Sequence, residues 1–488
     1  MNVTYPTYVE NKYIVTPFYR ISLEAWRRGL TVTFTENIKQ FRVSSTKNSY
    51  FFVRSMVVDP DLGERAREIC KYKDQTKQYL KKAQIPVPEG RRFPPEFPHN
   101  EIIGFAEQTG FPVVIKPVNG FRGEGVFPNV TDAATMKKIL HHLCHELKYD
   151  DIIVEERVEG NEYRIFVLGD RVVAALRKTP LHVTGNGKDT IRDLVLAKNN
   201  ERSKNFIKRK SIIIDDEMLL NVKEAGYHIK SILNENQILF LRKKNNFSVG
   251  GDSEDVTDEL PGHLKSTAVK AVAAIPGLYH AGVDIIHDEA RADSPSVVIE
   301  INALAEIGAH LHPRIGKGRD IPSALIDHYF PESIGARHRH RMFYYDPVPL
   351  IEKLRKNPKT PITLSLLPPE EMERQDIMVT GRVQGVAFRQ WARKQAIALQ
   401  LSGYVENQGR AGVHMVVAGD KKRVKEFSEL CKTGPPRTKV DNVSVSASDE
   451  AIVTGFRIIN KENRLLSTFR NLPRSIARKV KKLKNRLM

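Results

Sequence analysis

Two hydrophobic periods alternate along the first two thirds of the chain. Apolar residues recur at helical spacing in some stretches, and β-branched or alternating runs of strand length lie between them. The helical stretches are residues 21–28, 72–83, 100–109 and 131–145, and the strand-like runs are 30–34, 111–116, 151–156, 161–168, 171–176, 282–286 and 297–302. This interleaving of helices and strands predicts a fold that contains both helices and sheets.

The last part of the chain has its own order of elements. A strand beginning near residue 377 leads through a glycine loop into a helix. The apolar face of this helix is Phe388, Trp391, Ala392, Ala396 and Leu399. Strand patterns at 402–407 and 413–417, a helix at 421–432 and strand material at 440–459 follow. The order βαββαβ predicts a ferredoxin-like domain.

Composition marks the boundary between these parts. Residues 333–375 contain a basic run and six prolines, and we interpret them as a linker with one short helix near 350–356. The predicted domains are a small α/β lead-in at 1–70, a large domain at 71–332, the linker at 333–375, a ferredoxin-like domain at 376–460 and a tail at 461–488.

Cysteine content and hydropathy indicate the cellular compartment in which the protein is expected to fold. The 488 residues contain three widely separated cysteines, which excludes a cysteine-built metal site and predicts a reducing, cytoplasmic setting. The N-terminus lacks a signal-peptide pattern, and no apolar run approaches membrane-spanning length.

The net charge of +19 is concentrated at the C-terminal end, where residues 461–488 carry ten Lys or Arg and one Glu. Ile476, Val480, Leu483 and Leu487 recur at helical spacing, which predicts a basic amphipathic helix. An anionic membrane surface would attract this helix, and a solvated or domain-packing helix is the open alternative. Nucleic acid is disfavoured because no aromatic residue interleaves the basic positions after Phe469.

A strand and glycine loop at residues 111–126 indicate a phosphate grip. Lys116 ends the strand, and Gly120, Gly123 and Gly125 follow in the loop, where backbone amides can approach an anion without interference from Cβ atoms. An ordinary glycine-rich turn is the alternative. Downstream, Glu162 has a carboxylate of the kind that suits a ribose diol, and an acidic strand end exposed to water is the alternative there.

Three oxygen-bearing side chains lie on two later strand-like runs. Glu300 and Asn302 share one face of the second run with Val298, and we expect Asp284 of the first run to converge with them. Two carboxylates and an amide oxygen suit Mg²⁺ or Mn²⁺, which also takes phosphate oxygens. Carboxylates neutralised by Lys or Arg are the alternative, but the apolar surroundings favour a metal.

In this number and order, the motifs resemble those of the ATP-grasp carboxylate-amine ligases. The resemblance spans residues 73–332 and is closest to the ATP-grasp portions of cyanophycin synthetase and of the bifunctional glutathione-synthesising enzymes. It is carried by Lys73, Lys116 with its glycine loop, Glu155-Glu156 with Glu162, Asp284, and Glu300-Ile-Asn302. The segments 177–191 and 241–258 are also shared with those enzymes. The resemblance implies two α+β subdomains that enclose ATP.

The resemblance also implies a mechanism. Members of this family transfer the γ-phosphoryl group of ATP to a substrate carboxylate, and an amine then attacks the acylphosphate to give an amide. Carried over by position, the motifs assign residues to each part of ATP and to the metal. The phosphates would be bound by Lys73, Lys116 and the loop of Gly120, Gly123 and Gly125, the adenine by Glu156 and Val158, and the ribose by Glu162. The transferring phosphoryl group would be bound by Arg242, and Mg²⁺ by Asp284, Glu300 and Asn302. Phosphoryl transfer chiefly needs such cations and positioning.

The chain departs from that family after the expected metal ligands. Asn302-Ala-Leu-Ala305 stands where relatives often have Asn-x-Asn-Pro, although the first Asn is present. The altered segment continues to His310 and His312. We expect these histidines to border the substrate, where they either bind an acceptor or have a packing or solvated role.

Residues 376–459 resemble acylphosphatase over essentially their whole length. Segment 381–389 matches the loop of that family except at Ala387, which is usually Gly, and segment 403–407 matches its second motif. Amides at a helix N-terminus and an Arg in its first turn form an anion cradle. The resemblance implies that Arg389 binds the phosphoryl group and that Asn407 positions the attacking water. An alanine at 387 is expected to be tolerated unless the position needs a positive φ.

One predicted domain makes an acylphosphate and the next hydrolyses one. The leading hypothesis is an ATP-dependent carboxylate-amine ligase with amino acid or peptide substrates, whose acylphosphatase domain clears stalled or incorrect acylphosphate. One alternative makes acylphosphatase the main activity and the front half an ATP-binding regulator. Another is an ATP-binding scaffold docked on membranes through the tail.

Overall fold

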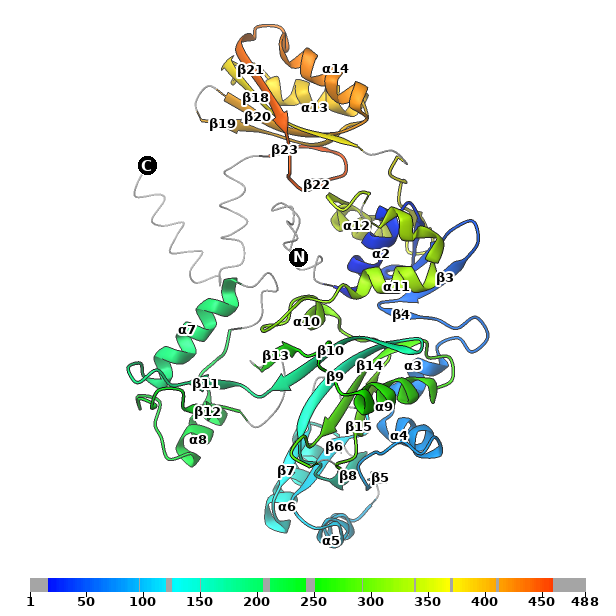
Figure 1. Ribbon diagram of the computed structural model, residues 1–488, viewed down its shortest axis with the longest axis vertical. Helices are drawn as coiled ribbons and strands as arrows, with labels where there is room; N and C mark the ends of the chain where they lie inside the picture. The colour runs from blue at the N-terminus through cyan, green and yellow to red at the C-terminus, as the bar shows by residue number, and fades with distance from the viewer. Residues whose placement is uncertain are drawn as a thin grey trace.

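The computed structural model describes residues 16–95, 97–119, 125–149, 151–204, 211–242, 251–291, 293–337, 339–368, 372–409 and 412–459. Its units follow one another along the long axis of the molecule (Figure 1). The C-terminal unit lies at one end, an N-terminal unit and a central sheet follow, and a small sheet lies at the other end. Among the described residues, no helix has both the length and the apolar character that crossing a bilayer requires.

The N-terminal unit packs a helix against a five-stranded sheet of order β17-β1-β2-β3-β4. The helix α2 (Pro17–Arg27) buries an apolar face that includes Tyr19 and Trp26, and Gly29, with φ at +80°, ends it. The first four strands along the chain are β1 (Thr31–Thr35), β2 (Asn37–Ser44), β3 (Ser49–Val53) and β4 (Met56–Val57).

The fifth strand of this sheet comes from the segment that was predicted to be a linker. The structure corrects that prediction, because much of the segment is folded. Within that segment lie β16 (Phe343–Tyr344), α12 (Pro347–Lys356) and β17 (Ile362–Thr363), preceded by the 3₁₀ helix η3 (Pro331–Ala336). β17 pairs with β1, and Leu350 and Leu354 are buried in the core around α2. Pro347 starts α12 instead of breaking it, because an N–H at the first helical position has no partner within the helix. Asp346 caps the helix by accepting from the N–H of Val348.

The central sheet is antiparallel throughout, with the order β13-β10-β9-β14-β15. Its strands are β9 (Asn161–Leu168), β10 (Arg171–Thr179), β13 (Asp252–Asp255), β14 (His280–His287) and β15 (Val297–Asn302). One face is apolar and is covered by α3 (Arg65–Lys71), α4 (Lys73–Lys82) and α9 (Gly262–Ala273). Near the other face lie the short helix α10 (Gly308–Leu311) and α11 (Ile321–Tyr329).

A bulge in β15 changes the predicted sidedness of that strand. Ile299 is the extra residue where the register with β14 shifts. Val298 therefore packs in the helix-covered core together with Ile301, whereas Glu300 and Asn302 lie on the opposite face. The predicted face shared by Val298, Glu300 and Asn302 is thus corrected, because one inserted residue reverses the alternation of side chains.

Two smaller units flank the central sheet. The first has the strand order β5-β8-β6-β7 and an apolar core shared with its two helices. Its elements are β5 (Gly90–Phe93), α5 (His99–Thr109), β6 (Val113–Pro117), β7 (Phe127–Val130), α6 (Ala133–His141) and β8 (Ile152–Glu156). The second has its own small core and consists of β11 (His182–Thr184), α7 (Ile191–Lys204), α8 (Asp216–Glu224) and β12 (Ile238–Phe240).

The C-terminal unit has the predicted ferredoxin-like plan. Its strand order is β21-β18-β20-β19-β23, with two helices packed against the sheet. Its elements are β18 (Glu373–Arg382), α13 (Phe388–Ala398), β19 (Ser402–Gln408), β20 (Gly412–Gly419), α14 (Lys421–Cys431), β21 (Lys439–Ala447), β22 (Ile452–Val453) and β23 (Phe456–Ile459). The fifth strand, β23, runs parallel to β19 at the sheet edge. The predicted tail at 461–488 lies outside the described residues.

Ala387, directly before α13, has a left-handed backbone with φ at +60° and ψ at 22°. The condition under which an alanine was expected to be tolerated here is therefore not met. A side chain in this region costs about 1–2 kcal/mol relative to a right-handed conformation. The cost is relieved by glycine, which adopts positive φ without a steric penalty.

We expect Ala387→Gly to raise the free energy of unfolding of the C-terminal unit by about 1 kcal/mol. Glycine removes the backbone strain of Ala387, and this gain exceeds the stability lost through the greater conformational entropy of glycine in the unfolded chain. The measurement is the urea midpoint followed by Trp391 fluorescence in a Trp26→Phe background, since the chain has two tryptophans. Ala398→Gly at the exposed end of α13 is the control and should lose up to about 1 kcal/mol. Equal destabilisation by both glycines would contradict a strained Ala387.

Candidate functional sites

The face of the central sheet that the helices leave open changes character along its strands. On β9, Tyr163 and Ile165 belong to the helix-covered core, whereas Glu162 and Arg164 lie on the other face. Further along this second face, Phe166 is buried against the N-terminal unit. Charged groups are therefore gathered at one end of the face and apolar groups at the other.

Asp284 lies in this charged region and is 2% exposed. Arg164 binds it twice, with Nε donating to Oδ1 at 2.8 Å and Nη2 to Oδ2 at 2.7 Å. Lys178 Nζ lies 3.1 Å from Oδ2. Burial opposes ionisation of Asp284, but Arg164 and Lys178 outweigh it and hold its pKa well below the usual value. The pairing with Lys or Arg that was the alternative to a metal is therefore present at this residue.

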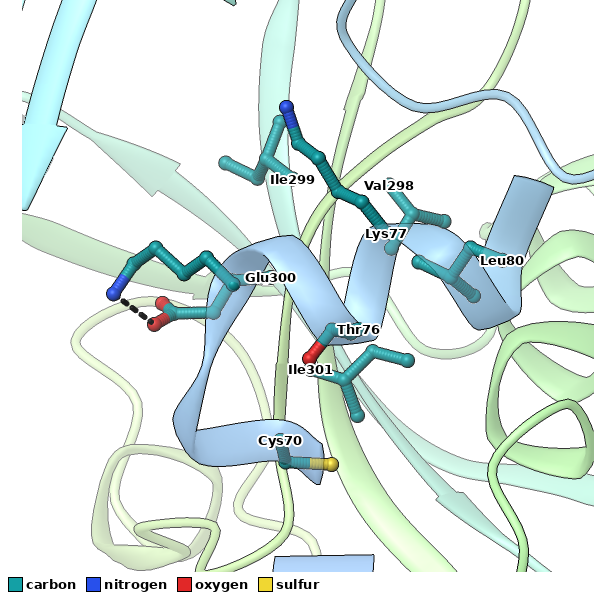
Figure 2. Close-up of a pocket in the computed structure, with 9 residues that line it drawn as sticks. Cys70, Thr76, Lys77, Leu80, Val298, Ile299, Glu300 and Ile301 are labelled. Atoms are coloured by element: carbon teal, nitrogen blue, oxygen red, sulfur yellow. Dashed lines mark ion pairs between the residues drawn. The ribbon is translucent and has the colours of Figure 1, made fainter. Parts of the chain in front are cut away.

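Glu300 and Asn302 are less completely paired. Glu300 is the direct partner of Asp284 across the two strands, and Lys73 Nζ lies 3.8 Å from its carboxylate. Nδ2 of Asn302 is buried and has no hydrogen-bond partner in the described part of the chain. Figure 2 shows Glu300 beside a small pocket between β15 and the helix that carries Thr76 and Lys77, with the ion pair to Lys73 dashed.

This donor set fits a hard divalent cation. Magnesium prefers carboxylate and amide oxygens and keeps several water ligands. The partly exposed carboxylate of Glu300 is compatible with such an ion, and the side-chain oxygen of Asn302 is the amide atom that could bind it. No group of three or more His, Cys, Asp or Glu side chains in the described ranges is placed to hold a metal. A metal here would therefore use Asp284, Glu300 and the Asn302 amide.

Three lysines gather around a second buried carboxylate. Lys77 and Lys116 both form ion pairs with Glu155, which is 3% exposed. The backbone N–H of Lys73 donates to the carbonyl of Val118 at 3.4 Å, which places the first turn of α4 next to the end of β6. Burial lowers the pKa of Lys73 and of Lys77. Lys77 and Lys116 pair with Glu155 and nearby Lys73 pairs with Glu300, so three ammonium groups face two carboxylates. The remaining positive charge suits a phosphate chain.

The loop after Lys116 is only partly described. Gly120 and Gly123 lie outside the described residues. Gly125 has φ at +68°, and a Cβ there would lie 3.2 Å from side-chain atoms of Leu143 and Pro117. A side chain at this position would therefore be strained by both backbone and packing.

The predicted adenine and ribose residues occupy different places. Glu156, at the end of β8, exchanges contacts with Glu89: its N–H donates to the Glu89 carbonyl at 2.8 Å, and its Oε1 accepts from the Glu89 N–H at 3.0 Å. Val158 is half-buried in the following loop. Glu162 accepts from Lys178 Nζ at 2.5 Å, and so belongs to the same network as Asp284.

Arg242 lies in the unit of α7 and α8. Its guanidinium forms ion pairs with Asp215, at 2.6 Å, and with Glu217, at the N-terminus of α8. The structure therefore places its ion pairs at α8 and not at Asp284. Its assignment to the transferring phosphoryl group stays a prediction.

The two flagged histidines differ in environment. His310 is 1% exposed, and its Nδ1 has no partner among the residues that the structure describes. Burial, with Arg164 nearby, lowers its pKa to about 3, so the ring is neutral at physiological pH. The ring of His312 is in contact with Arg20, whose Nη2 lies 3.2 Å from Nε2.

Sequence analysis did not single out Arg164, Lys178 or Lys77. Arg164 lies two residues beyond Glu162, so strand alternation alone places it on the same face. Lys178 is the direct cross-strand partner of Glu162, but that register is not visible in the sequence. Lys77 lies one helical turn after Lys73, which is a signal that helix periodicity could have given.

A second site lies at one end of the C-terminal sheet. The loop before α13 is tied to the turn between β19 and β20, because Nε2 of Gln384 donates to the carbonyls of Gly409, at 3.2 Å, and Gly412, at 2.7 Å. Arg389 is in the first turn of α13, and Asn407 lies near the end of β19 on the face that packs under this helix. Both predicted residues therefore lie at the same end of the sheet, around a helix N-terminus.

We expect Glu155→Gln to lower the free energy of unfolding by about 3 kcal/mol at pH 7, because two buried ammonium groups lose their counter-charge. Lys116 and Lys77, against the effect of burial, lower the pKa of Glu155 from its usual 4.5. The stabilisation is thus present above pH 4.5 and is lost as the pH falls through the lower pKa of the folded state. The measurement is unfolding of both proteins as a function of pH.

Glu89→Gln is the control, since Glu89 forms an exposed ion pair with Lys81 that should contribute less than about 1 kcal/mol. A gap between wild type and Glu155→Gln that did not narrow in acid would contradict the charged role of Glu155.

Two protein families match the chain. The RimK-like ATP-grasp domain matches residues 70–187, and Acylphosphatase matches residues 375–458. The chain is 30% identical over 280 residues to the cyanophycin synthetase of Geminocystis herdmanii, with 55% of this chain and 31% of that protein covered. It is 29% identical over 328 residues to the glutathione biosynthesis bifunctional protein GshAB of Enterococcus faecalis, with 64% of this chain and 42% of that protein covered.

The chain thus spans less than half of the length of these curated relatives. Among solved structures, an acylphosphatase from Coxiella burnetii matches 18% of this chain and 93% of its own, at 33% identity and a TM-score of 0.18. The two family matches and the two curated relatives show that the chain carries a RimK-like ATP-grasp domain followed by a C-terminal acylphosphatase domain.

Proposed function

We propose that the protein is an ATP-dependent carboxylate-amine ligase that works through an acylphosphate and carries its own acylphosphatase. The observation that supports the proposal most is the open face of the central sheet. There, Glu300 and Asn302 lie beside the Asp284 network, and Lys73 connects this face to the lysines around Glu155. Oxygen ligands for a metal next to ammonium groups for phosphates are what ATP-dependent phosphoryl transfer requires.

In this proposal, Lys73 and Lys116 bind the phosphates of ATP, and the carboxylate of Glu162 receives the ribose. A divalent cation held by Asp284, Glu300 and Asn302 would neutralise charge on the phosphates. The substrate carboxylate attacks the γ-phosphorus, the bond to the β-phosphate oxygen breaks, and ADP leaves. An amine then attacks the acyl carbon, phosphate leaves, and the nitrogen loses a proton to give the amide.

Arg164 acts indirectly in this scheme. Its two hydrogen bonds to Asp284 hold that carboxylate ionised and oriented. Lys178 contributes to both Asp284 and Glu162, so it couples the proposed metal ligand to the proposed ribose ligand.

The C-terminal domain is proposed to hydrolyse acylphosphates. Arg389 and the amides at the start of α13 bind the phosphoryl group, and Asn407 orients a water molecule that attacks phosphorus. Amino acids or peptides are the proposed ligase substrates, in keeping with the names of the cyanophycin and glutathione enzymes that the chain resembles.

We expect the purified chain to consume ATP with one carboxylate and amine pair from a panel of amino acids and short peptides, and Glu300→Gln to reduce that turnover at least about 100-fold. The measurement is release of ADP and phosphate together with product mass. Glu259→Gln, at an exposed carboxylate, is the matched control and should retain wild-type turnover. ATP turnover that survives Glu300→Gln would contradict the assigned site.

We expect removal of divalent cations by EDTA to abolish ATP consumption and added Mg²⁺ to restore it, because the phosphates of ATP would lose the counter-ion between them. Hydrolysis of benzoyl phosphate should continue in EDTA, since the proposed cradle consists of Arg389, Asn407 and backbone amides. If instead no pair in the panel produces ADP while benzoyl phosphate is hydrolysed, the ATP-grasp half would have to be a nucleotide-binding regulator.

A further inference from the structure

The C-terminal domain is not attached by a free linker but shares a core with the N-terminal unit. Tyr404, Val416 and Ala418, on the open face of its sheet, are buried in the same apolar core as α2 and α12. Beyond the sheet, Ile452 and Val453 of β22 are fully buried and pair in parallel with β16.

Directed contacts fix the orientation of this attachment. The N–H of Ile452 donates to the Met342 carbonyl and the N–H of Thr454 to the Tyr344 carbonyl, each at 2.8 Å. Arg457 Nη2 lies 3.0 Å from Oδ2 of Asp346. Backbone pairing, an ion pair and a shared core together prevent the domain from swinging freely.

The register of the sheet separates the attached end from the anion cradle. Ala418, at the attached end of β20, is aligned with Arg374 of β18 and with Ser402 of β19. The cradle loop lies at the other end of β20, where Gln384 donates to the carbonyl of Gly412. Positions 412 and 418 are separated by about 20 Å along an extended strand.

The cradle therefore lies at the end of the sheet away from the N-terminal unit. That unit and the central sheet stand between the C-terminal domain and the small sheet that carries Lys116 (Figure 1). In the part of the chain that the structure describes, the small sheet and the C-terminal domain lie at opposite ends of the molecule. A short-lived acylphosphate formed beside Lys116 and Glu300 would therefore have to leave the cleft to reach Arg389.

We propose that the acylphosphatase domain acts on acylphosphates that have left the ATP-grasp cleft and diffuse in solution, not on an intermediate handed directly from one site to the other. This inference rests on the proposed function. Its substrate class is a small, free acylphosphate, from this chain or from another source.

The reaction at the cradle is balanced by water alone. Water attacks phosphorus, the bond between phosphorus and the acyl oxygen breaks, and the products are a carboxylate, inorganic phosphate and a proton. Separation of the sites has a chemical advantage, because an acylphosphate still in the cleft is available only to the amine. Hydrolysis then removes only molecules that have escaped.

The first test measures whether the domain stays in place. Spin labels at Lys270→Cys on α9 and Lys439→Cys at the cradle end of β21, in a full chain whose native cysteines are replaced, give the distance between the central sheet's helix layer and the C-terminal domain. We expect the same single distance distribution with and without Mg²⁺ and a non-hydrolysable ATP analogue. A population with a shorter distance in the presence of nucleotide would overturn the inference.

The second test measures access to the cradle with benzoyl phosphate as the probe. We expect kcat/KM of the full chain to change less than two-fold when Mg²⁺ and the ATP analogue fill the nucleotide site. A change greater than five-fold would overturn the inference, because the cradle would then depend on the state of the other site.

The same assay separates this inference from the proposed function. Arg389→Ala should abolish hydrolysis of benzoyl phosphate, whereas Lys394→Ala, at an exposed position of the same helix, should leave it unchanged. Hydrolysis that survives Arg389→Ala, or none in the wild type, would contradict the proposed acylphosphatase site itself. Either result would leave the measured distances to decide the arrangement of the domains.

Discussion

The central sheet must bury both of its faces, and the two faces are not alike. One face is apolar along its whole length and packs on α3, α4 and α9. The other is apolar at one end, where Phe166, Leu168 and Ala174 join the N-terminal core, and charged at the other. The N-terminal unit covers the apolar end, and the charged end is where we propose that ATP and a metal bind. This asymmetry places the candidate site.

Burial of charge is the second constraint. Asp284 and Glu155 are almost fully buried, and neither is left without cations: Arg164 and Lys178 bind the first, and Lys77 and Lys116 the second. An uncompensated buried charge would cost several kcal/mol, so these groups constrain one another. Of the two lysines proposed to bind phosphate, Lys116 is thereby held in place by an acidic residue of the small sheet.

A shared core also determines how the two domains are related. Residues from the N-terminal helix, the supposed linker and the C-terminal sheet belong to one apolar cluster. The two domains therefore share part of one core, and the proposed acylphosphatase cradle lies at the end of its sheet away from that core. Fusion of two activities in a chain does not by itself imply transfer between them, and here sheet register argues against it.

Periodicity and short motifs in the sequence were sufficient to predict the α+β class, the βαββαβ order and most helices and strands. They were also sufficient to predict that Asp284 lies beside Glu300. Tertiary structure alone decided the bulge at Ile299, the folding of residues 343–363 into the N-terminal unit, and the left-handed backbone of Ala387. It also decided that Lys178 meets Asp284 and that Arg242 meets Asp215. These features depend on partners far apart in the chain, and no local pattern of residues specifies which distant segment will supply a strand, a counter-charge or a constraint on φ.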